Sequence, residues 1–177
     1  MRTVSVLMLA GLLLLLPAGQ SKAEGNMRIG VAADVLIPMG DYADIVSTGF
    51  GGTAWLEYQT SPEFSVLGLI GYYSWGGKDI DLGGFGSVSG PSVNGFSIRV
   101  GGRYYLMPAG GTRVYGQGEL GLLFASTDFA FAPVIGVTLP LSPDIDLDLS
   151  GRYDVVATTG TSLTSIGFRA GVSFGLK

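Results

Sequence analysis

The sequence predicts an all-β chain that folds as a single transmembrane antiparallel up-and-down β-barrel of about eight strands. The first observation is composition. Hydrophobic residues make up 47% of the 177 residues and charged residues only 14%, with a mean hydropathy of +0.44. The surface of a soluble domain is usually about 25–35% charged, so this chain is too apolar for a solvated surface.

The other two observations concern how the apolar residues are spread. Beyond residue 23 no uninterrupted apolar segment reaches the roughly 20 residues of a spanning helix. Instead, apolar residues alternate with small or polar ones, which is the period of a β-strand. Because only helices and closed barrels pair every backbone N–H and C=O group in lipid, a closed barrel is the expected solution.

Residues 1–23 are expected to be a cleaved secretory signal peptide, which leaves 24–177 as one barrel domain. Arg2 gives a positive start, residues 6–16 form an apolar run, and Ser21 and Ala23 place small residues before the cleavage site. The apolar run is shorter than the roughly 18 residues of a membrane span, which argues against a retained anchor.

The alternation is clearest in three stretches, residues 96–104, 145–155 and 166–176. In the last stretch every even position is apolar, whereas the odd positions are Gly, Arg or Ser. Each predicted strand is close to or above the 9–11 residues that cross a bilayer at a tilt. Read outward from these stretches, the strands are expected at 27–37, 49–59, 63–74, 95–107, 112–125, 129–140, 144–156 and 163–176.

The connections alternate in length, which predicts the orientation. Those at 59–62, 107–111 and 141–143 are short, whereas those at 38–48 and 75–94 are long. Short periplasmic turns and longer outer loops are usual for such barrels, so both termini are expected on the periplasmic side. Aromatic residues near strand ends are expected to form two interfacial girdles. These are Trp55, Tyr58, Tyr104, Tyr105 and Tyr115 at one end and Tyr72, Tyr73, Trp75, Phe129, Phe131 and Tyr153 at the other.

The alternation does not say which face lies inside, and a soluble barrel of lipocalin type would turn its apolar face inward. The polar face carries Gly, Ser, Arg and Asp, and only Lys78 and Lys177 remain as lysines after residue 23. A solvated surface would carry many Lys and Glu residues. The polar face is therefore expected to line a narrow lumen.

The inward polar set is the candidate site. Charges in so narrow a space must be paired, because an unpaired buried charge costs several kcal/mol. A turn centred near Ala109 would place Arg99 opposite Glu119, and the last loop would bring Arg169 close to Asp148 and Arg152. We interpret the set as a salt-bridged plug that fixes strand register; a conducting or substrate-binding lumen is the alternative. Its members are Asp34, Glu57, Arg99, Arg103, Arg113, Glu119, Asp146, Asp148, Arg152, Asp154 and Arg169.

Composition excludes several function classes. The chain has no histidine and no cysteine, so Ser/His/Asp and Cys/His catalysis are ruled out, and no enzyme activity, cofactor or metal is expected. Residues 116–121 match the dinucleotide fingerprint, but they lie inside a strand rather than before a helix. Asp144, Asp146 and Asp148 imitate a calcium loop without its later ligands. Removing Arg2 and Lys22 leaves eight basic residues against 14 acidic ones, a balance that argues against nucleic-acid binding.

Three segments carry a family resemblance: residues 100–106, 114–121 and 146–153. With them the chain resembles the porin-like outer-membrane β-barrel domain family, which includes the small barrels related to outer membrane proteins A and X. The resemblance covers nearly all of residues 26–177 and implies the outer membrane of a Gram-negative bacterium. The last strand is similar to the insertion signal read by the barrel-assembly machinery, with Arg169, Gly171, Phe174 and Leu176 in the motif positions.

Two main function hypotheses follow, and a third, a lipid-modifying enzyme, would need a carboxylate-only site. The first is a structural or surface-interaction barrel, adhesin-like, whose outer loops at 38–48 and 75–94 contact lipopolysaccharide or a host or cell-surface ligand. The second is a narrow passive porin-like channel for ions or small solutes. The resemblance also implies outer-membrane lipid as a partner, together with the barrel-assembly machinery and periplasmic chaperones during biogenesis.

Overall fold

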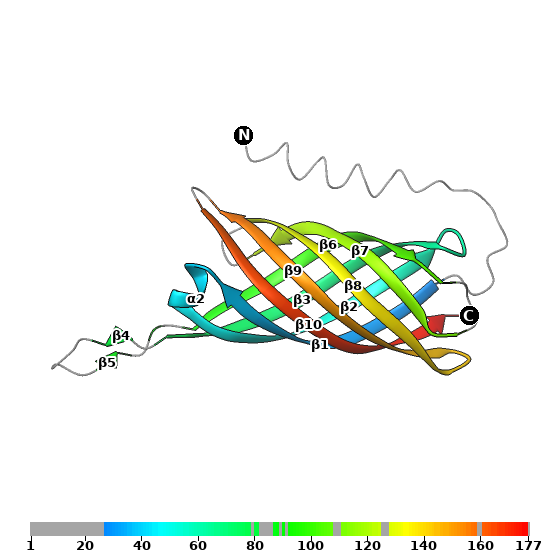
Figure 1. Ribbon diagram of the computed structural model, residues 1–177, viewed down its shortest axis with the longest axis horizontal. Coiled ribbons are helices and arrows are strands. Elements are labelled where there is room, and N and C mark those ends of the chain that lie inside the picture. The colour runs from blue at the N-terminus through cyan, green and yellow to red at the C-terminus, as the bar shows by residue number, and fades with distance from the viewer. Residues whose placement is uncertain are drawn as a thin grey trace.

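The computed structural model shows a closed antiparallel barrel of eight strands (Figure 1), in the order β1-β10-β9-β8-β7-β6-β3-β2. It describes residues 27–78, 80–81, 87–88, 90, 92–107, 111–124, 128–158 and 161–176. The expected signal peptide at 1–23 lies outside these residues. The barrel strands are β1 (Met27–Met39), β2 (Val46–Gln59), β3 (Phe64–Gly77), β6 (Val93–Tyr105), β7 (Arg113–Leu123), β8 (Asp128–Ser142), β9 (Ile145–Thr158) and β10 (Thr161–Leu176).

The first and last strands close the barrel. Strands β1 and β10 pair over their whole shared length, from Met27 opposite Leu176 to Met39 opposite Thr164. Every other barrel strand pairs with its neighbour in the chain, so no strand edge is left open to lipid. The predicted up-and-down barrel is therefore confirmed. In the described part of the chain, no helix is both long enough and apolar enough to cross a membrane.

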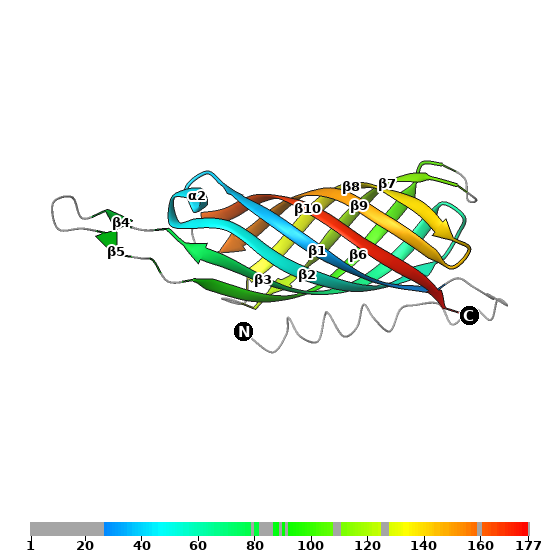
Figure 2. The ribbon, with the colours of Figure 1, turned by 90° about the horizontal axis from the view of Figure 1, so that it is seen from below.

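The two ends of the barrel differ, as Figures 1 and 2 show. At the turn end lie the start of β1, the end of β10 and the short connections β2–β3, β6–β7 and β8–β9. At the opposite loop end lie the short helix α2 (Tyr42–Ile45) and the two-stranded ribbon of β4 (Ile80–Asp81) and β5 (Ser87–Val88). The ribbon projects beyond the barrel rim.

Several strands reach further toward the loop end than the sequence predicts. Strand β2 begins at Val46 rather than residue 49, and β3 ends at Gly77 rather than residue 74. The pairing continues there after an irregularity, with Val46 opposite Gly77. The segments expected to be plain loops at 38–48 and 75–94 also contain α2 and the β4–β5 ribbon. Backbone pairing between strands at the rim thus includes residues that no longer follow the alternating hydrophobic pattern in the sequence.

The outer wall presents an apolar band. Large hydrophobic side chains such as Val31, Ile70 and Ile135 are exposed on it, Ile135 to 66%. None of the charged residues in the eight barrel strands is exposed. Such a surface suits the hydrocarbon layer of a membrane and not water. The polar face therefore points inward, and the lipocalin-type alternative is wrong.

The aromatic girdles are only partly as expected. The side chains of Tyr58, Tyr72, Tyr104, Phe129, Phe131 and Tyr153 do point outward. The prediction is wrong for the others, because the following residues are buried inside the barrel: Trp55, Tyr73, Trp75, Tyr105 and Tyr115. Gly30 makes room for one of them, since a Cβ there would overlap the ring of Trp55. Interior aromatic side chains fill lumen space that water would otherwise occupy.

Candidate functional site

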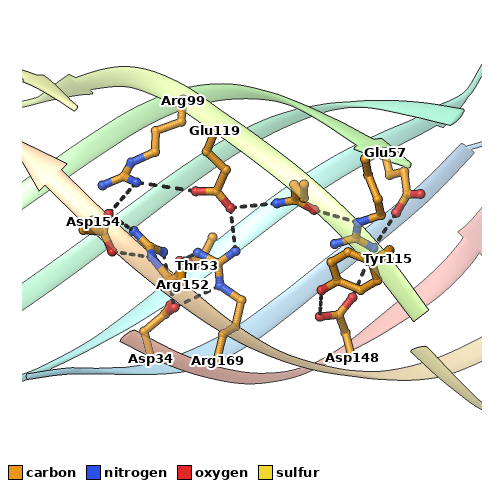
Figure 3. Close-up of polar contacts among 12 residues, drawn as sticks. Asp34, Thr53, Glu57, Arg99, Tyr115, Glu119, Asp148, Arg152, Asp154 and Arg169 are labelled. Carbon is orange, nitrogen blue, oxygen red and sulfur yellow. Dashed lines mark hydrogen bonds and ion pairs between the residues drawn. The ribbon is translucent and has the colours of Figure 1, made fainter. Parts of the chain in front are cut away.

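The predicted polar residues occupy the interior, and most of them form one connected set of contacts (Figure 3). Asp146 is the least enclosed member, with 13% of its side chain exposed at the turn end, where Arg28 pairs with it at 2.9 Å. The buried members are Asp34, Glu57, Arg99, Arg103, Arg113, Glu119, Asp148, Arg152, Asp154 and Arg169. They comprise five arginines and five carboxylates, so their formal charges balance.

A central network crosses the middle of the lumen. The Arg169 guanidinium on β10 donates to Asp34 on β1 at 2.9 Å and to Glu119 on β7 at 3.0 Å. Arg99 on β6 reaches Asp154 on β9 at 2.7 Å. The Arg169–Glu119 and Arg99–Asp154 contacts each join strands that are three places apart around the barrel, whereas Arg169 and Asp34 lie on adjacent strands. The network consists of Asp34, Arg99, Glu119, Arg152, Asp154 and Arg169, with Thr53 and Tyr73 hydrogen bonded to it.

Each carboxylate of the central network is held by more than one donor. Arg152 binds Asp154 in a two-pronged contact, at 2.5 Å from Nε and 2.6 Å from Nη2. The Thr53 hydroxyl donates to Asp34 at 2.6 Å. Multiple hydrogen bonds offset the cost of removing these charges from water. A planar guanidinium suits this task because its donors form a rigid fork.

A second network lies on the turn side of the first. Arg103 contacts Glu57 at 3.2 Å and Asp148 at 3.1 Å, and its guanidinium lies 4.0 Å from the centre of the Tyr115 ring. The Tyr105 hydroxyl donates to Glu57 at 2.7 Å. In this turn-side network, each carboxylate pairs with Arg103, and aromatic residues surround the pairs.

Gln117 connects the two networks. Its amide oxygen accepts from Arg103 at 2.6 Å, and its amide nitrogen donates to Glu119 at 2.7 Å. A side chain with both a donor and an acceptor suits this position, because it faces an arginine on one side and a carboxylate on the other.

An apolar cap closes the interior toward the loop end. It is formed by buried side chains of six strands, namely Leu36, Val46, Tyr73, Trp75, Leu123, Ala130 and Val156. Tyr42 of α2 packs on it, with its ring 6.4 Å from Trp75 in an edge contact. Burial raises the pKa of Tyr42, because it disfavours the phenolate. Between the cap and the central network is a cavity of only about 30 Å³, far below the roughly 300–1,000 Å³ of pockets that hold small ligands.

The predicted pairings need correction. In the β6–β7 register Arg99 faces Gly121, and Glu119 faces Gly101, so Arg99 and Glu119 are not opposite each other. They still meet diagonally at 3.5 Å. Arg169 faces Ser150 and pairs with Asp34 and Glu119, while Asp148 binds Arg103 instead. Arg169 does lie near Arg152 as expected, since both pair with the same oxygen of Asp34. The β6–β7 prediction failed because the register differs from the expected one, since Arg99 and Glu119 lie on adjacent strands. The prediction for Asp148 failed because Arg169 faces Asp34 on β1, while Arg103 reaches Asp148 across the lumen.

Sequence reasoning also missed several members of the two networks. They are Thr53, Tyr73, Tyr105, Tyr115 and Gln117, and the turn-end residue Arg28 lies outside the predicted set as well. The signal was present: Tyr115 and Gln117 have the same parity as Arg113 and Glu119 on β7, so alternation alone puts them inside. The general preference of aromatic residues for membrane interfaces obscured it.

The residues of the expected insertion signal lie along β10. Arg169 belongs to the central network, whereas Phe174 and Leu176 point outward near the turn end, about 40% exposed. Gly171 lies against β1, where a Cβ would overlap the carbonyl oxygen of Val31. Recognition of this strand by an assembly machinery stays a prediction. Within the described residues, no group of three or more His, Cys, Asp or Glu side chains is arranged to hold a metal ion.

Comparison with solved structures identifies the fold. Neisserial surface protein A is similar over 85% of this chain and 97% of its own, with 17% identity and a TM-score of 0.62. The chain has the fold of the small outer-membrane β-barrels. Ail of Yersinia pestis covers 86% of this chain with all of its own length, at 14% identity and a TM-score of 0.53. The predicted resemblance to small outer-membrane barrels is confirmed at the level of the fold.

Two further findings complete the comparison. The N-terminal barrel domain of Pseudomonas aeruginosa OprF matches over 86% of this chain and 100% of its own, at 13% identity and a TM-score of 0.50. Ail has also been crystallised in complex with the heparin analogue sucrose octasulfate. No protein-family model matches the sequence, and no curated protein matches it either.

Proposed function

We propose that this protein resides in the outer membrane as a non-enzymatic barrel with a structural and surface-interaction role, displaying its loop end outside the cell. The observation that carries the proposal is the closed interior. Two charge-paired networks and an apolar cap fill the lumen in succession, and the cavity beneath the cap is about 30 Å³. A barrel of eight strands is just wide enough for its side chains to fill it. Function is then expected at the loop end.

The loop end has the form of an interaction surface. Strands β3 and β6 continue into the β4–β5 ribbon, which projects past the rim (Figures 1 and 2). The Lys78 amide donates to the carbonyl of Ile45 at 3.1 Å, so the base of the ribbon is tied to α2. A rigid base under a projecting segment is a favourable arrangement for contact with another surface.

The charges of this end suggest what it contacts. Four acidic residues fall in the connections that meet there, Asp41, Asp44, Asp79 and Asp81, and a fifth, Asp128, begins strand β8, against the single cation Lys78. Ail binds a polysulfated sugar analogue. Such an anion would be repelled by the acidic loops of this chain, so we propose a positively charged partner surface.

Export by a cleaved signal peptide at 1–23, insertion by the barrel-assembly machinery and escort by periplasmic chaperones are parts of the same proposal. Lipid and lipopolysaccharide would surround the apolar band. The charged residues of the described barrel strands all avoid that band, so the proposed lateral contacts are apolar.

A narrow channel is the second candidate, because the barrel has a pocket of about 400 Å³ open at the turn end. Single-channel recording of refolded residues 24–177 in a planar bilayer separates the two. We expect a silent bilayer while heat-dependent gel mobility shows folded protein. Discrete, reproducible conductance steps would contradict the closed-barrel proposal and favour the channel.

The surface role is tested by replacing residues 78–92 with an Asn-Gly turn, which suits a two-residue hairpin. The variant should fold, since the replaced segment lies beyond β3 and β6, and should bind a polylysine-coated surface less than the parent chain. The folding of the variant and its binding to polylysine are both measured in nanodiscs of zwitterionic lipid. Glu63→Gln, which removes one exposed acid at the turn end, is the control and should bind normally. Equal retention of loop variant and parent would refute the role of this segment.

A further inference from the structure

A pocket of about 400 Å³ opens into the barrel at the turn end, away from the loop surface discussed above. Its walls come from β1, β2, β7, β8 and β9, and from the β6–β7 and β8–β9 connections. Arg28, Arg113 and Asp146 are its charged lining residues. Pockets that hold small ligands have volumes of about 300–1,000 Å³, so this one has room for a compact solute or the end of a peptide.

Arg113 is an exception among the arginines of the barrel strands. Each of the other five, Arg28 included, makes an ion pair, whereas no ion pair within the described residues includes Arg113. Its side chain is nevertheless buried, with the whole residue only 8% exposed. It lines the pocket, so its donors are available to a group that enters there.

The Arg113 guanidinium is held by stacking. Its central carbon lies 3.7 Å from the centre of the Tyr105 ring, the distance of face-to-face contact. Tyr105 is itself fixed, since its hydroxyl donates to Glu57 at 2.7 Å and accepts from Arg103 at 3.3 Å. Stacking occupies the face of a guanidinium and leaves its N–H groups free around the edge.

The other two charges of the pocket satisfy each other. Arg28 pairs with Asp146 at 2.9 Å and also donates to Ser173 on β10 at 3.3 Å. Asp146 therefore already has a cation, and Arg113 is the one charged side chain of the lining that makes no ion pair within the described residues. Its formal charge is balanced by the turn-side network, in which Glu57 and Asp148 share the single cation Arg103. A positive, preorganised fork in a space open to solvent is suited to a planar anion.

We propose that this pocket is a binding site for a carboxylate, carried by a small solute or by the C-terminus of a peptide, which lies in the plane of the Arg113 guanidinium. The site is independent of the proposed surface function, because it lies at the opposite end of the barrel. With the turn end on the periplasmic side, its ligands would come from the periplasm. The fork would bind the two carboxylate oxygens side by side, while the ring of Tyr105 keeps the guanidinium in place.

The test is an NMR titration of the folded barrel in zwitterionic nanodiscs, following the side-chain Nε–Hε signal of Arg113. The probes are succinate, N-acetyl-Ala-Ala with a free C-terminus, and the same dipeptide with an amidated C-terminus. We expect saturable shifts with one or both of the free carboxylates and none with the amide. Stronger binding of succinate would assign the site to free solutes, and stronger binding of the dipeptide to peptide ends.

Variants test whether Arg113 is responsible, with backbone amide signals of the pocket as the readout. Arg113→Gln should weaken binding at least about tenfold, and Arg113→Lys should also weaken it, because lysine keeps the charge but lacks the bidentate fork. Lys78→Gln removes one positive charge at the loop end and should bind like the parent. Absence of saturable binding by both carboxylates, or unchanged binding by folded Arg113→Gln, would overturn the proposal.

Discussion

Replacing Glu119 with alanine tests whether the central network holds the barrel together. Glu119 is fully buried and contacts Arg169 at 3.0 Å, Arg99 at 3.5 Å and Gln117 at 2.7 Å. The central network has three arginines and three carboxylates, so the variant leaves one unbalanced positive charge. Breaking a buried pair costs about 3–5 kcal/mol. We expect the lower end, about 3 kcal/mol, because Arg99 and Arg169 each keep one other carboxylate.

Equilibrium unfolding by urea in lipid vesicles measures this cost, with the fluorescence of the interior residues Trp55 and Trp75 as the signal. With a urea dependence of about 2 kcal/mol per M, the unfolding midpoint should fall by about 1.5 M. Glu63→Ala, in an exposed turn, should change the free energy of unfolding by less than about 0.5 kcal/mol. A loss below about 1 kcal/mol for Glu119→Ala would refute the reasoning.

A double variant makes the test specific for charge balance. Glu119→Ala combined with Arg99→Ala leaves two arginines facing two carboxylates in the central network, because Asp154 is still bound by Arg152. The losses of unfolding free energy in the two single variants should therefore add up to more than the loss in the double variant. The difference is the coupling energy between Arg99 and Glu119. Strict additivity would show that the two residues stabilise the barrel independently, contrary to the contacts.

The remaining predictions concern the wall and the effect of salt. Gly121→Ala should lower the yield of folded barrel, because a Cβ there would overlap the carbonyl oxygen of Ile98 on β6; Gly118→Ala on the same strand has open space and should fold normally. Ile135→Arg should cost about 2–4 kcal/mol of unfolding free energy in lipid if this exposed side chain lies near the bilayer midplane, whereas Ile45→Arg at the rim should cost about 0–1. Raising NaCl from about 0.05 to 0.5 M should weaken loop-end binding to polylysine but leave the urea midpoint nearly unchanged, because buried pairs are screened far less than exposed charges.

The strands and the inward residues were predictable because alternation is a local property. Successive residues of β9 point alternately to the lumen and to the lipid. The inward position of Arg152 and Asp154 can therefore be read from the residues next to them in the sequence. The barrel fold then follows from the need to pair every backbone group. Neither inference requires knowledge of the strand register.

The contacts were not predictable in the same way, because they depend on register and on reach across the lumen. A turn position wrong by one residue moves the partner of Arg99 by two, from Glu119 to Gly121. The interior position of Trp55 depends on Gly30 of the neighbouring strand, whose missing side chain leaves space for the ring. Packing of this kind involves residues that are far apart in the sequence, so no local sequence pattern predicts it.

The distribution of charge connects the stability of the barrel to its proposed role. The five arginines and five carboxylates buried in the lumen cancel, as do Arg28 and Asp146 at the turn end. The acidic excess of residues 24–177 is then carried by acids outside these ion pairs. Four of them fall in the connections at the loop end, and a fifth, Asp128, begins strand β8 there. The larger share of this acidic charge at the loop end would orient an approaching cationic surface toward the loops before contact. Because the buried charges balance and the middle of the lumen is filled by the two networks, loop sequence can change without disturbing the interactions that hold the barrel closed.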